Sequence, residues 1–394
     1  MKNQSISFSF TLLLGVLIAL AALGTDLYVP ALPAVAEAFG SSVDAAQFTL
    51  TTFFVGFAAG QLLWGPLSDR YGRKPVLLAG LALALAAALA GAAAASVGEV
   101  AAARFAQGVG MASGPLVGRT IVRDLYSHEQ AAVLLARMTI VFSVVPIAAP
   151  AAGAALAATL GWETVFWCHA AVAAALLAAV ALALRETAPG ERASIHPGEI
   201  ARTFAMILRE RRFLAPFLVM LCAQLGILAF VSNSAFTLVR GFGVSTVGYG
   251  LMFAAVMLGQ IGGAWASSRL VRRAGIAGML RLGTAVVLAG GAAAAVLAWA
   301  GVAHWSAVVL PFMVFLFGSA LIVPNATAAA LTPFPAAAGA ASSLMGAAAF
   351  ALGALLSTAL AAMFDGTARP MASAAALAGA GAFLLHRSYA RGPA

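Results

Sequence analysis

The chain has 394 residues, of which 63% are hydrophobic and 9% are charged, and its mean hydropathy is +1.00. Soluble domains are about 45–50% apolar, so this composition excludes a soluble globular protein. The net charge of +9 would favour a nucleic-acid partner only for a soluble protein. Apolar runs of about twenty residues recur along the chain, each long enough to cross a bilayer as a helix, whereas barrel strands of ~10 residues alternate in polarity. We therefore expect an all-α integral membrane protein with no nucleic-acid partner.

The first apolar run extends from Ile6 to Leu23. It is longer than the ~7–15-residue apolar core of a secretory signal peptide, so we interpret it as a membrane span. The two cysteines, Cys168 and Cys222, lie inside apolar runs. We interpret them as small core residues rather than as a disulfide or a metal pair, and we expect no metal site.

The apolar runs predict about twelve membrane helices by the twenty-residue rule. If the N-terminus is cytoplasmic, only Arg240 and Arg369 of the 22 lysines and arginines fall outside, and Arg104 falls within a span. The positive-inside rule therefore places both termini in the cytoplasm. The predicted spans cover residues 7–29, 45–67, 75–95, 99–122, 131–159, 164–184, 214–238, 247–268, 276–300, 305–329, 340–364 and 370–386.

One inside segment, residues 185–213, is long and charged, and Pro189, Gly190 and Pro197 interrupt it before the amphipathic stretch EIARTFAMILRERR. We predict a cytoplasmic linker here, between two six-helix halves at 1–184 and 214–394. Attraction of its basic face to anionic lipid headgroups is favoured over binding to a protein partner.

Residues 65–75, GPLSDRYGRKP, place several charges between the second and third spans. Gly65 and Gly72 permit a tight turn, and Asp69 can pair with a cation or lie at a helix N-terminus. A weaker copy, SSRLVRR, begins at Ser267, 199 residues after Ser68 and thus close to half of the 394 residues. The spacing favours two repeated halves, and such a turn could latch two helices together.

The string G-x-L-S-D-R-x-G-R-K resembles the signature loop of the major facilitator superfamily. GTDLYVPALP at 24–33, RFAQGVG at 104–110 and VRDLY at 122–126 are similar to the drug/proton antiporters of the Bcr/CflA group, which includes bicyclomycin-resistance proteins and relatives of the chloramphenicol and florfenicol exporters. This resemblance covers essentially the entire chain. It implies two six-helix halves related by pseudo-two-fold symmetry, proton-driven drug export and a place in the bacterial inner membrane. We expect a monomer.

By the same resemblance, the loop after the second span forms a cytoplasmic latch that holds the outward-facing state. The residues assigned to this latch are Gly65, Asp69, Arg70, Gly72, Arg73 and Arg123.

The fifth span departs from the family pattern. Antiporters of the superfamily usually carry G-x-x-x-G-P-x-x-G-G there, whereas residues 145–154 keep only Pro150 and Gly153 of that motif. We interpret Pro146, Pro150 and Gly153 as a hinge in this span, and the degraded motif leaves uptake symport open as an alternative to antiport.

Asp26 is the one acidic residue well inside a predicted span, and an ionisable group there marks a functional site by default. It lies ~28 Å along the helix from Ser7, so an ordinary interfacial carboxylate is the alternative. Arg104 in the fourth span could snorkel to the outer surface, but the resemblance implies a role in the proton relay. His169 in the sixth span is a second titratable candidate, although a lone histidine on an apolar helix is more often a hydrogen-bonded core residue.

Polar and aromatic residues inside the spans are candidates for a substrate cavity between the halves. A cavity with amides and almost no fixed charge suits neutral or weakly charged lipophilic compounds. The candidates are Tyr28, Phe57, Gln61, Gln107, Phe142, Gln224, Asn233, Phe236, Gln260, Phe312 and Asn325.

We therefore expect a proton-driven exporter of small lipophilic drugs, with the proton gradient as its energy source and no cofactor. A proton-coupled carrier of metabolites such as purine nucleosides or amino acids remains the alternative. The sequence contains no H-E-x-x-H, G-x-S-x-G or G-x-x-x-x-G-K-[ST], which disfavours a membrane-embedded enzyme and an ATP-driven pump.

Overall fold

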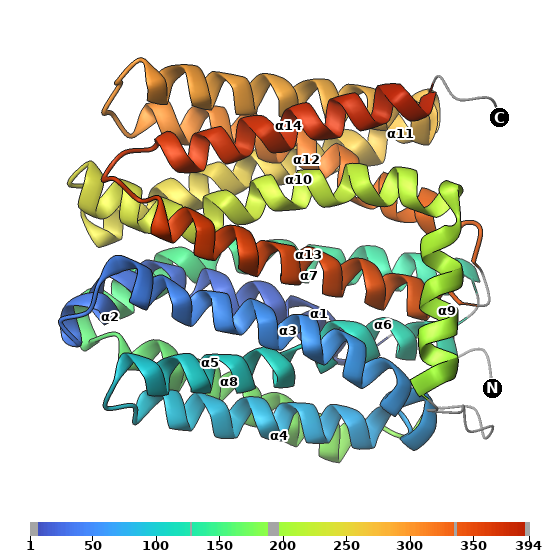
Figure 1. The fold of residues 1–394 in the computed structure, drawn as a ribbon. Coiled ribbons are helices and arrows are strands. Elements are labelled where there is room, and N and C mark those ends of the chain that lie inside the picture. Colours follow the sequence, from blue (N-terminus) through green and yellow to red (C-terminus); the bar gives the residue numbers. More distant parts are fainter. Residues whose placement is uncertain (1–6, 127, 188–196, 335–336, 391–394) are drawn as a thin grey trace. The chain divides into compact units, whose positions relative to one another are not determined.

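The computed structural model describes residues 7–126, 128–187, 197–334 and 337–390. All regular elements in these ranges are helices (Figure 1). The chain divides into two compact units, Met1–Arg202 and Thr203–Ala394, and each is described by itself.

The first unit begins with α1, which ends at Asp26 and is followed by a short 3₁₀ turn, η1. Ser42 and Ser96 begin two of the later helices, because their side chains accept hydrogen bonds from the backbone N–H groups of Ala45 and Glu99. The elements of this unit are α1 (Phe8–Asp26), η1 (Val29–Ala31), α2 (Leu32–Ala38), α3 (Val43–Tyr71), α4 (Arg73–Ala92), α5 (Val97–Met111), α6 (Ser113–Leu125), α7 (His128–Leu160) and α8 (Glu163–Ala183).

Helix α9 (Pro197–Arg209) contains the point at which the two units divide, and it runs across the direction of α10 (Figure 1). The amphipathic stretch that the sequence placed before the seventh span is thus helical. The remaining elements are α10 (Arg211–Ala235), the π-helical turn η2 (Phe236–Gly241), α11 (Thr246–Trp299), α12 (Ser306–Leu331), α13 (Ala338–Ala362) and α14 (Arg369–Ala390).

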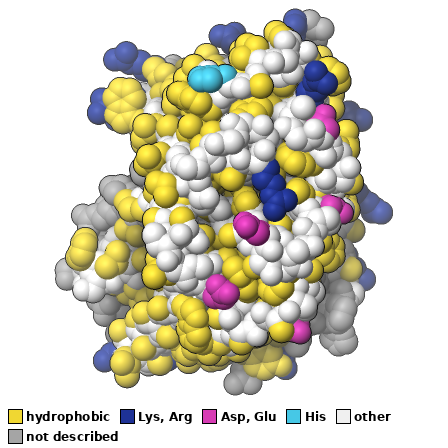
Figure 2. All heavy atoms as spheres, turned by 90° about the vertical axis from the view of Figure 1, so that its left-hand side faces the viewer, with side chains coloured by type: hydrophobic (Ala, Val, Ile, Leu, Met, Phe, Trp, Pro, Cys, Tyr) yellow, Lys and Arg dark blue, Asp and Glu magenta, His cyan; other side chains and the backbone are white. Residues whose placement is uncertain are grey.

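The predicted fold class is confirmed, and each predicted span coincides with one or two helices. Eight helical segments in the described residues are long and apolar enough to cross a membrane, and one of these, α11, contains two predicted spans. The chain is therefore a multi-pass membrane protein. Figure 2 shows a face made mostly of hydrophobic and uncharged atoms, with few acidic and basic side chains among them.

Three predicted spans are not among these eight segments. The fourth is divided at Ala112 into α5 and α6, neither of which reaches the length of a span. The fifth corresponds to α7, of which Val144–Leu160 stands as a shorter apolar helix, and the twelfth corresponds to α14.

Glycines with positive φ form the turns that follow the second and eighth predicted spans. Gly72 has φ 101° and Gly275 has φ 67°, a conformation that glycine adopts without steric cost. Gly72 follows Ser68 by four residues and Gly275 follows Ser267 by eight. Beyond this serine, the helix before the second turn therefore continues about one helical turn further than its counterpart.

Candidate proton-coupling site

The end of α1 is an irregular segment inside the first unit. The N–H of Tyr28 donates to the carbonyl of Thr25 at 3.1 Å, so it is directed away from the carbonyl of Gly24, its usual helical acceptor. Pro30 lies at the start of η1 and has no N–H to donate. The break therefore leaves backbone carbonyls of the last turn of α1 available to side chains of other helices.

Asp26 is the last residue of α1, and its side chain is buried with 6% exposure. It is the only acidic residue among the buried residues of the described chain. Its Oδ1 accepts a hydrogen bond of 2.9 Å from Oγ1 of Thr25. An ordinary interfacial carboxylate would be exposed, so this burial argues for a site that is desolvated in the present state.

Arg104 projects from α5 to the same turn and is fully buried rather than extended to the outer surface. Its Nη2 donates to the carbonyl of Gly24 at 2.8 Å, and its Nη1 donates to Oε1 of Gln107. The guanidinium carbon lies 4.2 Å from the ring centres of both Tyr28 and Phe53. Two aromatic faces and the carbonyl end of α1 together stabilise its positive charge.

Asp26 and Arg104 meet at one helical turn without forming an ion pair. In the described part of the chain, the ion pairs all involve Arg73, and Asp26 contacts the hydroxyl of Thr25 instead. The two predicted residues are thus linked through the backbone of residues 24–26. This arrangement leaves the carboxyl group free of a fixed counter-charge.

Three further helices contact the broken end of α1. Thr49 of α3 forms a 2.6 Å hydrogen bond with the hydroxyl of Tyr28, and Nε2 of His169 on α8 lies 3.1 Å from the carbonyl oxygen of Leu23. On α7, Gly153 packs so closely against the carbonyl of Leu27 that a Cβ atom would overlap it. Gly153, predicted as part of a hinge, therefore lies beside the candidate proton site.

A second polar cluster joins the ends of α3 and α6. Arg73 donates from Nη1 to Oδ1 of Asp69 at 2.6 Å and to the hydroxyl of Ser68 at 3.2 Å. Its Nε donates to Oδ2 of Asp124 at 2.8 Å. Charge-assisted bonds to two carboxylates give the Arg73 side chain a defined orientation.

Glu186 extends this cluster to the segment that follows α8. Its carboxylate accepts from the backbone N–H groups of Arg73 at 2.9 Å and Lys74 at 3.1 Å, and it thereby caps the first turn of α4. A Cβ atom on Gly72 would overlap Glu186, so the absence of a side chain at Gly72 leaves the space that this carboxylate occupies.

Of the other predicted latch residues, Arg70 lies on α3 beside Asp69, and Gly65 lies within α3. The side chain of Arg123 lies outside the described residues. Sequence reasoning missed Asp124 and Glu186 as partners of the loop. The available signal was that each is acidic and lies two residues after the end of a predicted span.

The predicted cavity residues fall into two groups, one in each compact unit. Tyr28 and Gln107 belong to the surroundings of Arg104, and Phe57 packs against Phe53 with ring centres 6.0 Å apart. Asn325 donates to the hydroxyl of Ser267 at 2.9 Å. Asn233, Phe236 and Phe312 are buried, and Gln61, Gln224 and Gln260 are partly buried. The side chain of Phe142 lies outside the described residues. Of the predicted hinge residues, Pro146 and Pro150 are buried in α7.

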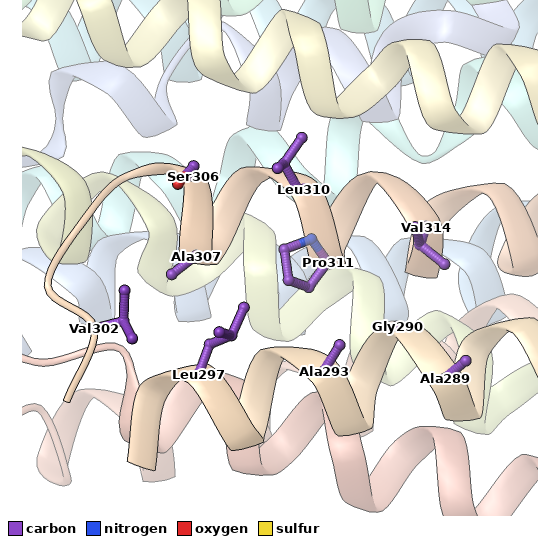
Figure 3. A pocket seen from close by; sticks show the side chains of 10 residues that line it. All are labelled: Ala289, Gly290, Ala293, Leu297, Val302, Ser306, Ala307, Leu310, Pro311 and Val314. Carbon is purple, nitrogen blue, oxygen red and sulfur yellow. The ribbon is translucent and has the colours of Figure 1, made fainter. Parts of the chain in front are cut away.

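A groove of about 460 Å³ lies in the second unit, between the second half of α11 and the first half of α12 (Figure 3). Small residues such as Ala289 and Ala293 face Leu310 and Val314 across it. Ser306 is its only polar lining side chain, and no ionisable group lines it. It therefore lacks the chemistry of a proton site.

Comparison with known proteins decides the family. The family model described as Major Facilitator Superfamily matches residues 14–358. The chain belongs to the major facilitator superfamily. It is 31% identical to a "Bicyclomycin resistance protein homolog" of Haemophilus influenzae over 94% of this chain and 93% of that protein. It is also 31% identical to a "Chloramphenicol resistance protein" of Pseudomonas aeruginosa, over 74% of this chain and 70% of that protein.

Solved structures show the same fold. A D-xylose-proton symporter is similar with a TM-score of 0.75 and 14% identity, over 97% of each chain. The human organic anion transporter MFSD10 is similar with a TM-score of 0.68 and 19% identity, over 95% of this chain and 98% of that one. The major facilitator fold predicted from the loop motif is thus confirmed.

Proposed function

We propose that this major facilitator protein exports small, mostly neutral lipophilic drugs of the phenicol or bicyclomycin type, in exchange for protons. The observation that carries the proposal is the buried carboxyl group of Asp26 at the broken end of α1, which four other helices contact. The names of the relatives, which are drug-resistance proteins, support the substrate class.

In the proposed cycle, Asp26 carries the proton. Water that reaches the site from outside stabilises the carboxylate until it takes up a proton, and closure that removes water stabilises the neutral acid. When the site opens to the cytoplasm, substrate binding promotes release of that proton. Arg104, held on the carbonyl of Gly24, supplies positive charge on the same turn without neutralising the carboxylate permanently.

The proton gradient supplies enough free energy for useful drug gradients. One proton contributes about 2.3 kcal/mol per 100 mV of membrane potential and ~1.4 kcal/mol per pH unit. A typical bacterial membrane therefore offers roughly 4 kcal/mol per proton, which corresponds to about a thousand-fold substrate gradient.

The membrane arrangement belongs to the same proposal. The chain lies in the bacterial inner membrane with both termini in the cytoplasm, as its distribution of arginines favours, and it acts as a monomer. The cluster of Asp69, Arg73, Asp124 and Glu186 then lies at the cytoplasmic end and latches the outward-facing state. Anionic lipid headgroups attract the basic linker.

The proposal is tested by measuring drug accumulation in exporter-deficient cells. The panel contains chloramphenicol, florfenicol, bicyclomycin, lipophilic dyes and purine nucleosides. Cells with the parent protein are expected to accumulate less of the phenicols or bicyclomycin than empty cells. This difference is expected to vanish in the Asp26→Asn variant and when a protonophore collapses the gradient.

Two results would contradict the proposal. Export that persists fully after the gradient collapses would exclude proton coupling. Reduced accumulation confined to nucleosides would replace the drug exporter with a metabolite carrier.

A further inference from the structure

We propose that His169 is a positioning residue for proton coupling, because it holds the last turn of α1, and with it Asp26, against α8. The inference rests on the proposed function in one respect, namely that Asp26 carries the proton. It assigns His169 a task distinct from carrying the proton itself.

The contact between His169 and α1 is directional. The imidazole is fully buried, and its Nε2 lies 3.1 Å from the carbonyl oxygen of Leu23. A carbonyl oxygen only accepts hydrogen bonds, so Nε2 must carry the hydrogen and donate it. Nδ1 is buried and has no hydrogen-bond partner in the described part of the chain. The side chain therefore donates its hydrogen bond to the backbone of α1 rather than to a carboxylate.

The carbonyl of Leu23 can accept this bond because α1 is ending. The N–H of Leu27 reaches that carbonyl only at 3.3 Å, which is longer than the usual 2.9–3.0 Å. Cationic and imidazole side chains commonly satisfy such terminal carbonyls of a helix. Leu23 lies three residues before Asp26, so the bond fixes the turn on which the carboxyl group stands.

A second contact from α8 holds the other side of Asp26. Phe166, one turn before His169, meets the ring of Tyr28 edge-on, with ring centres 5.6 Å apart at 69°. It also meets the imidazole edge-on, at 6.3 Å and 82°. Because Phe166 contacts Tyr28 and His169 contacts Leu23, a displacement of α8 would move Leu23 and Tyr28 together. Tyr28 is also one of the two aromatic faces on Arg104.

The geometry thus couples the position of the segment from Leu23 to Tyr28 to that of α8. A bend at this segment changes the surroundings of Asp26. The alternative is a histidine that contributes only to stability. A variant that restores a hydrogen-bond donor at the position of Nε2 distinguishes the two roles. A positioning role requires that donor, whereas a role in stability alone does not.

The experiment compares three variants of His169. His169→Gln keeps an N–H donor at a similar reach, His169→Phe keeps the ring without the donor, and His169→Asn keeps a donor that is too short to reach Leu23. Substrate-driven proton release is measured with a pH-indicator dye on the purified full chain, with chloramphenicol as the probe, and thermal unfolding is recorded for each variant. Ser113→Ala is the matched control, because it removes a buried hydroxyl that bonds only within its own chain segment.

We expect His169→Phe and His169→Asn to lower substrate-driven proton release about tenfold, as for the loss of one buried hydrogen bond. His169→Gln should restore it to within about threefold of the parent, and Ser113→Ala should leave it unchanged. If His169→Phe unfolds, His169→Asn carries the test.

The inference is overturned if folded His169→Phe or His169→Asn releases protons like the parent, or if folded His169→Gln is as impaired as they are. Asp26→Asn separates this result from the proposed function. Loss of proton release in Asp26→Asn with normal release in the His169 variants would refute the positioning role alone, whereas normal release in Asp26→Asn would refute the proposed carrier.

Discussion

Gly153 shows how a missing side chain decides the geometry around Asp26. The backbone of α7 at this residue lies against the carbonyl of Leu27, and a Cβ atom there would overlap backbone rather than a movable side chain. Gly24, on α1, likewise leaves room for the ring of Phe53 and the sulfur of Met111. Close packing of the fifth span on the break therefore depends on glycine.

We predict that Gly153→Ala displaces α7 from the break and costs about 1–3 kcal/mol, as overpacking of a buried contact does. Thermal unfolding of the purified chain and drug accumulation in cells measure the two effects, and both should worsen. Gly339→Ala is the control, because a Cβ atom there meets nothing within 4 Å. Equal stability and equal export in the two variants would show that the contact is unimportant.

At this candidate site, the sequence predicted which residues are ionisable inside the spans but not their contacts. Asp26 and Arg104 were predictable because ionisable side chains are rare in apolar spans. Their lack of an ion pair was not predictable, because it depends on the N–H of Tyr28 turning to Thr25 and leaving the carbonyl of Gly24 for Arg104. Such a change arises from the packing of several helices on the break.

The ends of helices α3, α4 and α6 differ from the corresponding elements of the second unit. In the first unit, Arg73 joins Asp69 and Asp124 by charged hydrogen bonds. In the second unit, the contact near the repeated loop is the uncharged bond from Asn325 to Ser267. The repeat thus keeps a polar contact near the turn, while only the first copy carries a described ion pair.

We predict that Asp69→Asn weakens the latch and raises the inward-facing population. The carboxylate of Asp69 is half exposed, so the loss should be about 1 kcal/mol or less, up to roughly fivefold in the ratio of states. Distances between spin labels on the cytoplasmic ends measure the populations, and drug export rates accompany them. Ser268→Ala is the control, since Ser268 stands 199 residues after Asp69 and bonds only within its own helix.

The latch proposal fails if Asp69→Asn leaves both the populations and the transport rate at the level of Ser268→Ala. A change in rate without a change in populations would also contradict it, because a latch acts on the balance of conformations.

At the scale of elements, hydropathy predicted the spans well, because the bilayer sets their length. It did not predict the division of the fourth span at Ala112 or the π-helical turn after Ala235. Both are local departures inside apolar sequence, where hydropathy carries no signal. The cap that Glu186 provides for α4 was equally hidden, since it joins residues more than a hundred positions apart.

For the whole molecule, the loop motif predicted the superfamily, and the family match confirms it. The linker at 185–213 stays a prediction, although the division between the compact units falls within α9. The direction of transport also stays a prediction, because the fifth span keeps only part of the antiport motif. Neither composition nor helix packing determines whether proton and drug move in opposite directions.

The central claim is that drug and proton are exchanged through Asp26, and substrate-driven proton movement in proteoliposomes tests it most directly. A pH-sensitive dye is trapped inside vesicles without an imposed gradient, and chloramphenicol or bicyclomycin is added outside while its radiolabelled uptake is followed. The account predicts that the vesicle interior becomes alkaline as drug enters, and that Asp26→Asn abolishes the pH change. Acidification of the interior, drug uptake without any pH change, or the same alkalinisation in Asp26→Asn would contradict it.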